Sequence, residues 1–133
     1  MTIIDGTGPR HRENMTITRL LAQMTVTDSV AAKAWYTGLL GRAPDAEPMP
    51  GLLEWHLTDS FGVQVWAEAV RAGTSCMVLD ESALDDLAGR LDRVGIEHEA
   101  PQDATTVRIL PLQDPDGNRI VFTGPLSAHQ ATR

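Results

Sequence analysis

Hydrophobic and polar positions follow the same order twice along the chain. In each copy an apolar strand ends in Asp, a helix follows and closes at a glycine, and further strands come after it. The first copy has its strand at residues 24–28 and its helix at 29–40, and the second copy has them at 76–80 and 82–94. Two such halves facing each other would form a cleft, which is where ligand sites are usually found.

The first helix is predicted from its ends and from the spacing of its apolar residues. Asp28 or Ser29 is expected to cap its first turn, and Gly41 provides the left-handed residue that ends it. The residues at helical spacing that we expect to form its buried face are Val30, Ala31, Ala34 and Trp35.

The second helix carries a capping signal and an apolar stripe. Ser82 followed by Asp85 resembles a capping box, in which two side chains bond free amides of the first turn. The stripe consists of Leu84, Leu87, Ala88, Leu91 and Val94. The charged residues of this helix, Arg90 among them, are expected to face water.

Four runs of β-favouring residues complete the two copies. These runs are 52–57, 62–67, 105–113 and 119–123. The first two flank the turn-forming pair Asp59-Ser60 and the last two flank Asp114-Pro115-Asp116-Gly117-Asn118, so each pair predicts a hairpin. Prolines between Ala43 and Gly51 exclude a helix or a central strand, so we predict a loop there.

Composition and charge narrow the classes of protein. The 133 residues are 42% hydrophobic and 22% charged, which predicts one globular domain. The formal net charge of -7 argues against nucleic acid or an anionic membrane as a partner. No apolar run approaches a membrane span or a signal peptide, and the single Cys76 excludes an intrachain disulfide, so we expect a cytoplasmic protein.

Two motifs resemble those of a known family. The first is an Asp after the first strand, an aromatic pair at Trp35-Tyr36 and the ending Leu40-Gly41; the second is the hairpin at 114–122. In this order and separation they resemble the glyoxalase, bleomycin resistance protein and extradiol dioxygenase superfamily, also called vicinal oxygen chelate (VOC) proteins. Within this resemblance Tyr36 is expected to pack rather than to take part in chemistry.

The resemblance implies an α+β fold of two βαβββ modules, forming a curled mixed sheet around a cleft. Module one is expected at about 17–69 and module two at about 74–126, within a single domain spanning 17–126. Residues 1–16 are predicted to be a flexible arm and residues 127–133 a tail. Members of this family commonly dimerise, so the resemblance also implies a homodimer.

Strand alternation within the implied fold predicts which side chains line the cleft. The ligand-binding candidates are Leu21, Gln23, Thr25, Gln64, Trp66, Thr74, Val121, Arg119 and Thr123. Trp66 would stack on a planar ring, and Arg119 facing a cavity would pair with a carboxylate or phosphate. The alternative for Arg119 is a surface arginine whose head group lies in solvent.

The family's metal positions hold residues that do not suit a metal. Metal-dependent members carry His or carboxylate ligands at positions matched here by Leu21, Thr74 and Val121, with Gln64 or Trp66 at the fourth. A transition metal needs about three imidazole, carboxylate or thiolate ligands. We therefore expect no metal and no other cofactor.

Three side chains are candidates for metal-free chemistry. Glu68 would act as a general base if its pKa were raised, and otherwise lies at a solvated strand end. His56 would donate to a ligand, or is a satisfied structural residue, and Arg119 would stabilise an oxyanion. Cys76 has no activating base nearby in sequence and is expected to be a small buried residue.

Three functional hypotheses remain. The first is metal-independent binding of a small aromatic or amphipathic molecule, as in the bleomycin resistance branch. The second is a metal-free isomerase, lyase or cyclase. The third is a metal-dependent lyase or dioxygenase whose ligands occupy other positions than those matched above.

Overall fold

The computed structural model describes residues 15–126, and the order of elements confirms the repeated pattern. Module one contains β1 (Leu20–Val26), α2 (Ser29–Leu40), β2 (Ala46–Met49), β3 (Leu52–His56), β4 (Phe61–Ala67) and the short 3-10 helix η1 (Ala69–Arg71). Module two contains β5 (Cys76–Asp80), α3 (Leu84–Val94), β6 (Gln102–Asp103), β7 (Arg108–Gln113) and β8 (Arg119–Gly124). The predicted arm and tail lie largely outside the described residues, so their boundaries stay a prediction.

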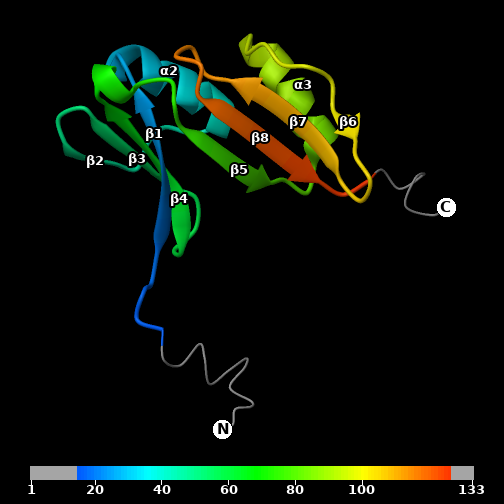
Figure 1. Cartoon of the computed structure of the whole chain (residues 1–133), viewed down its shortest axis with the longest axis horizontal. Coiled ribbons are helices and arrows are strands. Elements are labelled where there is room, and N and C mark those ends of the chain that lie inside the picture. Colours follow the sequence, from blue (N-terminus) through cyan, green and yellow to red (C-terminus); the bar gives the residue numbers. More distant parts are fainter. Residues whose placement is uncertain (1–14, 127–133) are drawn as a thin grey trace, which may run out of the picture.

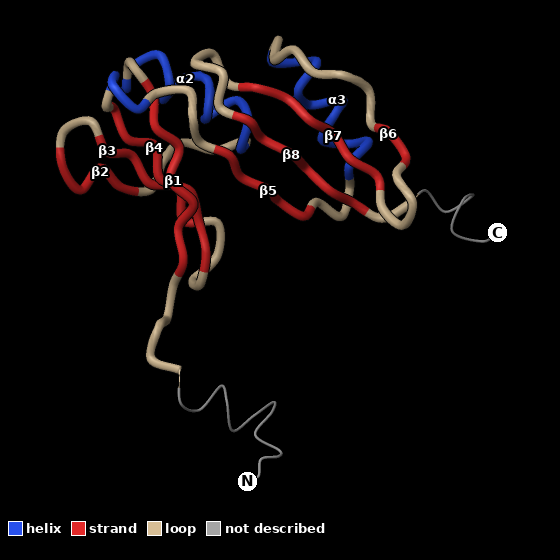
Figure 2. Tube along the Cα trace, viewed as in Figure 1, coloured by secondary structure: helices blue, strands red, loops and turns tan. Residues whose placement is uncertain are grey.

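Each module forms its own four-stranded mixed sheet. The strand orders are β1-β4-β3-β2 and β5-β8-β7-β6, and in each sheet the first strand pairs in parallel with the last strand of its module. Figures 1 and 2 show the two sheets side by side and diverging from one another. The fold class is confirmed, but within residues 15–126 the strands form two separate sheets that do not close into one curled sheet.

One hydrophobic core joins both helices to both sheets. Leu84, Leu87 and Leu91 of α3 are buried as predicted. In α2 the prediction was wrong, because the helix buries Ala32, Tyr36 and Leu39 while Val30 is 78% exposed. Apolar residues lie all around this short helix, so their spacing alone did not identify the face that packs.

The ends of the helices correct two further predictions. Asp28 caps α2 as expected, but α3 begins at Leu84, and the amide of Ala83 donates to the carboxylate of Glu81 in place of a Ser82 capping box. Arg90 does not face water, since its guanidinium donates to the carbonyl oxygens of Gly38 and Leu39 at the end of α2, at 2.7 and 2.8 Å. This side chain bonds the free carbonyls of the other module's helix.

The proline-rich stretch is also not wholly a loop. Residues 46–49, including Pro48, form β2 at the edge of the first sheet. An edge strand tolerates proline because its outer amides need no partner strand.

A buried polar network joins the two modules. Asn118 is 0% exposed, and its side chain donates to the carbonyl of Thr25 and to Asp114 while accepting from the amide of Ser75. The Asp114 carboxylate also accepts a 2.7 Å hydrogen bond from the hydroxyl of Tyr36. Burial and this acidic partner raise the pKa of Tyr36, so it stays protonated and serves packing.

No helix between residues 15 and 126 is both long and apolar enough to span a bilayer.

Candidate functional site

The face of the first sheet that lies away from the helices carries a row of polar side chains. The opposite face is core, since Met24, Val65 and Trp55 are 0% exposed. Strand alternation therefore places Gln23 and Gln64 on the open face, and the strand register aligns them with Glu54 across β1, β4 and β3.

These residues form a continuous hydrogen-bonded row. The Gln23 amide nitrogen lies 3.0 Å from the carbonyl oxygen of Gln64, and the Gln64 amide nitrogen lies 2.6 Å from Oε2 of Glu54. The other carboxylate oxygen, Oε1, lies 2.9 Å from Nε2 of His56. We refer to Gln23, Gln64, Glu54 and His56 as the polar row.

Glu54 holds the centre of the polar row. It is 7% exposed, and the hydrogen bonds from His56 and then from Gln64 lower the pKa of this carboxyl despite its burial. The charge of Arg19 acts in the same direction. Glu54 is therefore ionised at neutral pH and accepts hydrogen bonds on both oxygens.

Sequence reasoning missed Glu54. The signal was present in β3, where burying Leu53 and Trp55 places Glu54 and His56 together on the other face. A glutamate between two apolar strand residues gave no hint of its partner Gln64, which lies on another strand.

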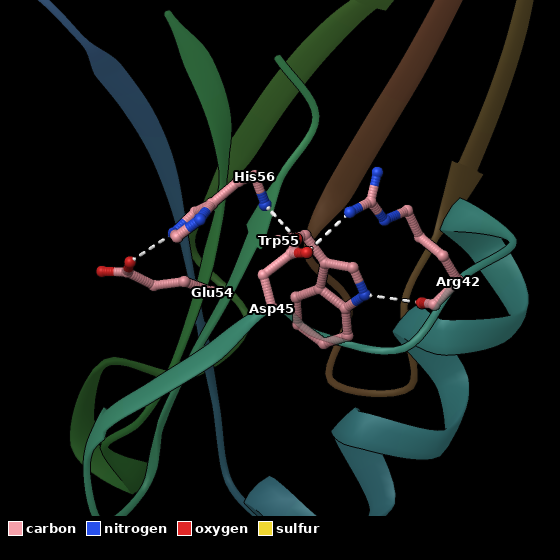
Figure 3. A network of polar contacts seen from close by, with 5 residues as sticks. All are labelled: Arg42, Asp45, Glu54, Trp55 and His56. Carbon is pink, nitrogen blue, oxygen red and sulfur yellow. Dashed lines mark hydrogen bonds and ion pairs between the residues drawn. The ribbon is translucent and has the colours of Figure 1, made fainter. Parts of the chain in front are cut away.

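The loop before β2 and the backbone of β3 fix the position of His56. Figure 3 shows the contacts: the amide of His56 donates to Asp45, Asp45 pairs with Arg42, and the indole nitrogen of Trp55 donates to the carbonyl of Arg42. The bond from the His56 amide is the main reason that the pKa of Asp45 is lowered. The imidazole is thus held at two points, by its backbone and by Glu54.

Trp66 and Glu68 lie beyond the polar row, where β4 ends. The indole nitrogen of Trp66 donates to Glu68 at 3.1 Å, and both residues are half-buried. Trp66 pairs across the strands with Leu52, which has the same orientation. An indole and an aliphatic side chain thus lie next to the polar row on one face.

The structure distributes the other predicted ligand-binding residues over three places: the open face, the junction between the modules, and β8 of the second sheet. Leu21 is half-buried on the same face as Gln23. Thr25 does not line an open cavity, because it is 5% exposed at the module junction, where its amide donates to Ser75. Thr74, further along this junction, donates to the carbonyl of Arg71.

Arg119, Val121 and Thr123 lie on β8 in the second sheet. Arg119 is exposed, Val121 is buried, and Thr123 donates to Asp80. Within residues 15–126 no hydrogen bond or ion pair links these three side chains to the polar row. Cys76 was predicted to be buried and is exposed, because β5 is an edge strand with an uncovered face.

Three cavities of the described chain lie away from the polar row. One of about 1020 Å³ lies beside Trp35, His98 and Pro111. An apolar one of about 570 Å³ lies between the modules, against Ala22 and Met77. Neither is lined by a predicted ligand-binding or catalytic residue, although Thr123 lines a third of about 530 Å³.

Within residues 15–126 no three His, Cys, Asp or Glu side chains converge as a metal site would require. The polar row supplies only one imidazole and one carboxylate, and both are already bonded to each other. These donors do not fit a transition metal held by this chain alone.

No family model and no curated protein matches this sequence. Solved structures do match it. A glyoxalase/bleomycin resistance protein from Catenulispora acidiphila DSM 44928 is 29% identical with a TM-score of 0.75, over 81% of this chain and 98% of that one. TnmS3, an antibiotic binding protein from Streptomyces sp. CB03234, is 24% identical with a TM-score of 0.70, over 85% of this chain and 100% of that one.

A lactoylglutathione lyase from Agrobacterium tumefaciens is 16% identical with a TM-score of 0.66, over 79% of this chain and 91% of that one. At this identity, as for TnmS3, the similarity concerns the fold. The paired βαβββ modules, the opening and closing motifs and these neighbours agree. The chain belongs to the glyoxalase/bleomycin resistance protein/dioxygenase superfamily.

Proposed function

We propose that this protein binds a small aromatic or amphipathic molecule on the open face of its first sheet, without a metal ion. The observation that carries the proposal is the polar row next to the Trp66 indole. An indole offers a large flat apolar surface, and the row orients a bound molecule through hydrogen bonds.

Two further observations support binding over metal chemistry. The superfamily's metal positions hold Leu21, Thr74 and Val121, none of which supplies an imidazole or carboxylate. The neighbour TnmS3 is described as an antibiotic binding protein, which is the class of activity proposed here.

A Trp66→Ala variant tests the proposal. Protein stripped of metal with EDTA is titrated with a library of planar aromatic compounds and antibiotics, using calorimetry for binding and mass spectrometry for turnover. We expect a library member to bind, to remain unchanged, and to bind the variant roughly tenfold more weakly because the stacking surface is lost.

Trp35→Ala is the matched control, because Trp35 lies on α2 beside a different cavity. Its binding should equal that of the wild type. Failure of the whole library to bind the stripped protein would contradict the proposal, as would binding that appears only after a divalent metal is restored.

A metal-free isomerase, lyase or cyclase is the second candidate, favoured by the bond between His56 and Glu54. A carboxylate that holds one imidazole nitrogen leaves the other nitrogen free to take a proton, as a general base requires. Conversion of a bound compound that is lost in His56→Gln, with binding retained, would select this candidate. Glu68 and Arg119 stay open as additional groups.

We further propose that the protein is a homodimer. β1 and β5 are edge strands of the two sheets, and Leu20 and Val78 on these strands are 68% and 63% exposed. Exposed apolar side chains on edge strands favour association with a second chain. Sedimentation at micromolar concentration should give twice the 14.4 kDa mass of the chain, and a single species of 14.4 kDa would exclude the dimer.

A further inference from the structure

The negative charge of Glu54 fixes which group donates and which accepts in each hydrogen bond of the polar row. An ionised carboxylate has no proton to donate, so both of its partners must donate. His56 therefore carries a hydrogen on Nε2, and Gln64 turns its amide nitrogen toward Glu54. Neither side chain is free to choose the opposite orientation.

This direction extends to both ends of the row. Since the Gln64 nitrogen faces Glu54, its carbonyl oxygen faces β1, where the Gln23 nitrogen donates at 3.0 Å. Gln23 is thereby oriented, and its own carbonyl oxygen is left without a partner among the described residues. At the other end a neutral His56 has an unprotonated Nδ1, which is also an acceptor.

Both ends of the polar row thus present an acceptor atom, the carbonyl oxygen of Gln23 and Nδ1 of His56. The side-chain amide nitrogens of Gln23 and Gln64 each donate one hydrogen bond within the row. The second hydrogen of each glutamine nitrogen remains available to a ligand acceptor lying between the ends. The Trp66 N–H is taken by Glu68 and does not add a donor.

The spacing of the ends follows from the sheet. Gln23, Gln64 and Glu54 lie in register on three adjacent strands, and His56 bonds the last of them. Two strand spacings separate the ends by about 10 Å. That span suits a molecule of two fused rings with a polar group on each ring, and Trp66 lies two residues from Gln64 on the same face.

Building on the proposed binding function, we propose that the ligand is a planar molecule with a hydrogen-bond donor, N–H or O–H, at each of two opposite ends. A molecule of the same shape with acceptors at both ends would place oxygen against oxygen at Gln23 and oxygen against nitrogen at His56. It would therefore bind more weakly.

A matched pair of probes tests this, 2,7-dihydroxynaphthalene and 2,7-dimethoxynaphthalene, which differ in having or lacking O–H donors. Titrations are run in EDTA at alkaline pH, because the inference concerns the neutral imidazole. We expect the dihydroxy compound to bind the wild type roughly tenfold more tightly, as for the loss of one hydrogen bond.

Two variants test which residues cause the preference for the dihydroxy compound. Glu54→Gln replaces the acceptor that sets the direction of the row with a group that also donates, so the preference should fall toward equality. Gln23→Leu removes an acceptor at one end from an exposed position, so it should fold normally and lose part of the preference. Glu47→Gln is the control, since it removes the same charge from the exposed edge strand β2 and should keep the full preference.

The outcomes separate this inference from the proposed function. Equal binding of the two naphthalenes, or an unchanged preference in both Glu54→Gln and Gln23→Leu, would overturn the inference while leaving ligand binding intact. Absence of naphthalene binding while a library compound binds would overturn it in the same way. Failure of the entire library would overturn both.

Discussion

An Asn118→Ala variant is expected to lose about 3–5 kcal/mol of the free energy of unfolding. The side chain is 0% exposed and bonds Thr25, Ser75 and Asp114, which come from both modules and the closing turn. Alanine would leave the partly buried Ser75 amide without this acceptor, and Thr25 and Asp114 would each lose a hydrogen bond from the buried side chain. The loss should appear in chemical denaturation and as a fall of roughly 10–20 °C in Tm.

Gln102→Ala is the control for this prediction. Gln102 is exposed on β6 and donates one hydrogen bond, to Glu99. Its removal should change the free energy of unfolding by less than about 0.5 kcal/mol. A loss below about 1 kcal/mol in Asn118→Ala would show that the network does not join the modules as described.

A Gly62→Ala variant is expected to lose about 3 kcal/mol or more, because the added methyl group has no space. A Cβ at this position would lie 2.2 Å from the carbonyl oxygen of Trp55 on the neighbouring strand. Both atoms belong to the middle of the first sheet, so relief requires β3 and β4 to separate. That shift would also move Glu54 away from Gln64, so ligand binding should weaken together with stability.

Gly89→Ala is the control, because it makes the same chemical change but is expected to raise the free energy of unfolding rather than lower it. Its Cβ would meet only the Arg93 guanidinium, at an ordinary 3.5 Å, inside α3. Alanine is favoured over glycine in a helix by up to about 1 kcal/mol, so this variant should be slightly more stable than the wild type. A Gly62→Ala protein as stable as Gly89→Ala would contradict the tight strand contact.

Local signals explain which elements could be predicted. Asp28 and Gly41 delimit α2, and the turn at 114–118 delimits the last hairpin, because capping and turn residues act within a few positions of themselves. The buried face of α2 was not predictable in this way. Alanines and larger apolar residues occur on both sides of this helix, and the buried side is the one that contacts the core.

In the candidate site, too, local patterns could be predicted and contacts between distant residues could not. Alternation along β1 and β4 placed Gln23 and Gln64 on one face, and the structure joins them by a hydrogen bond. Glu54 was not predicted because its position in the row depends on Gln64, which is aligned with it on the neighbouring strand. Arg119 and Thr123 lie on the last strand of module two, as predicted, but within residues 15–126 no hydrogen bond or ion pair links them to the polar row.

By itself, the sequence determined the repeated order of strands and helices, the capping residues and the alternation of faces, since each follows from interactions between near neighbours in the chain. Only the tertiary structure decided how the sheets diverge, how Arg90 and Asn118 join the modules, and that Glu54 orients the polar row. Those features depend on side chains brought together from distant positions, where the geometry of contact, and not the local pattern, sets which groups meet.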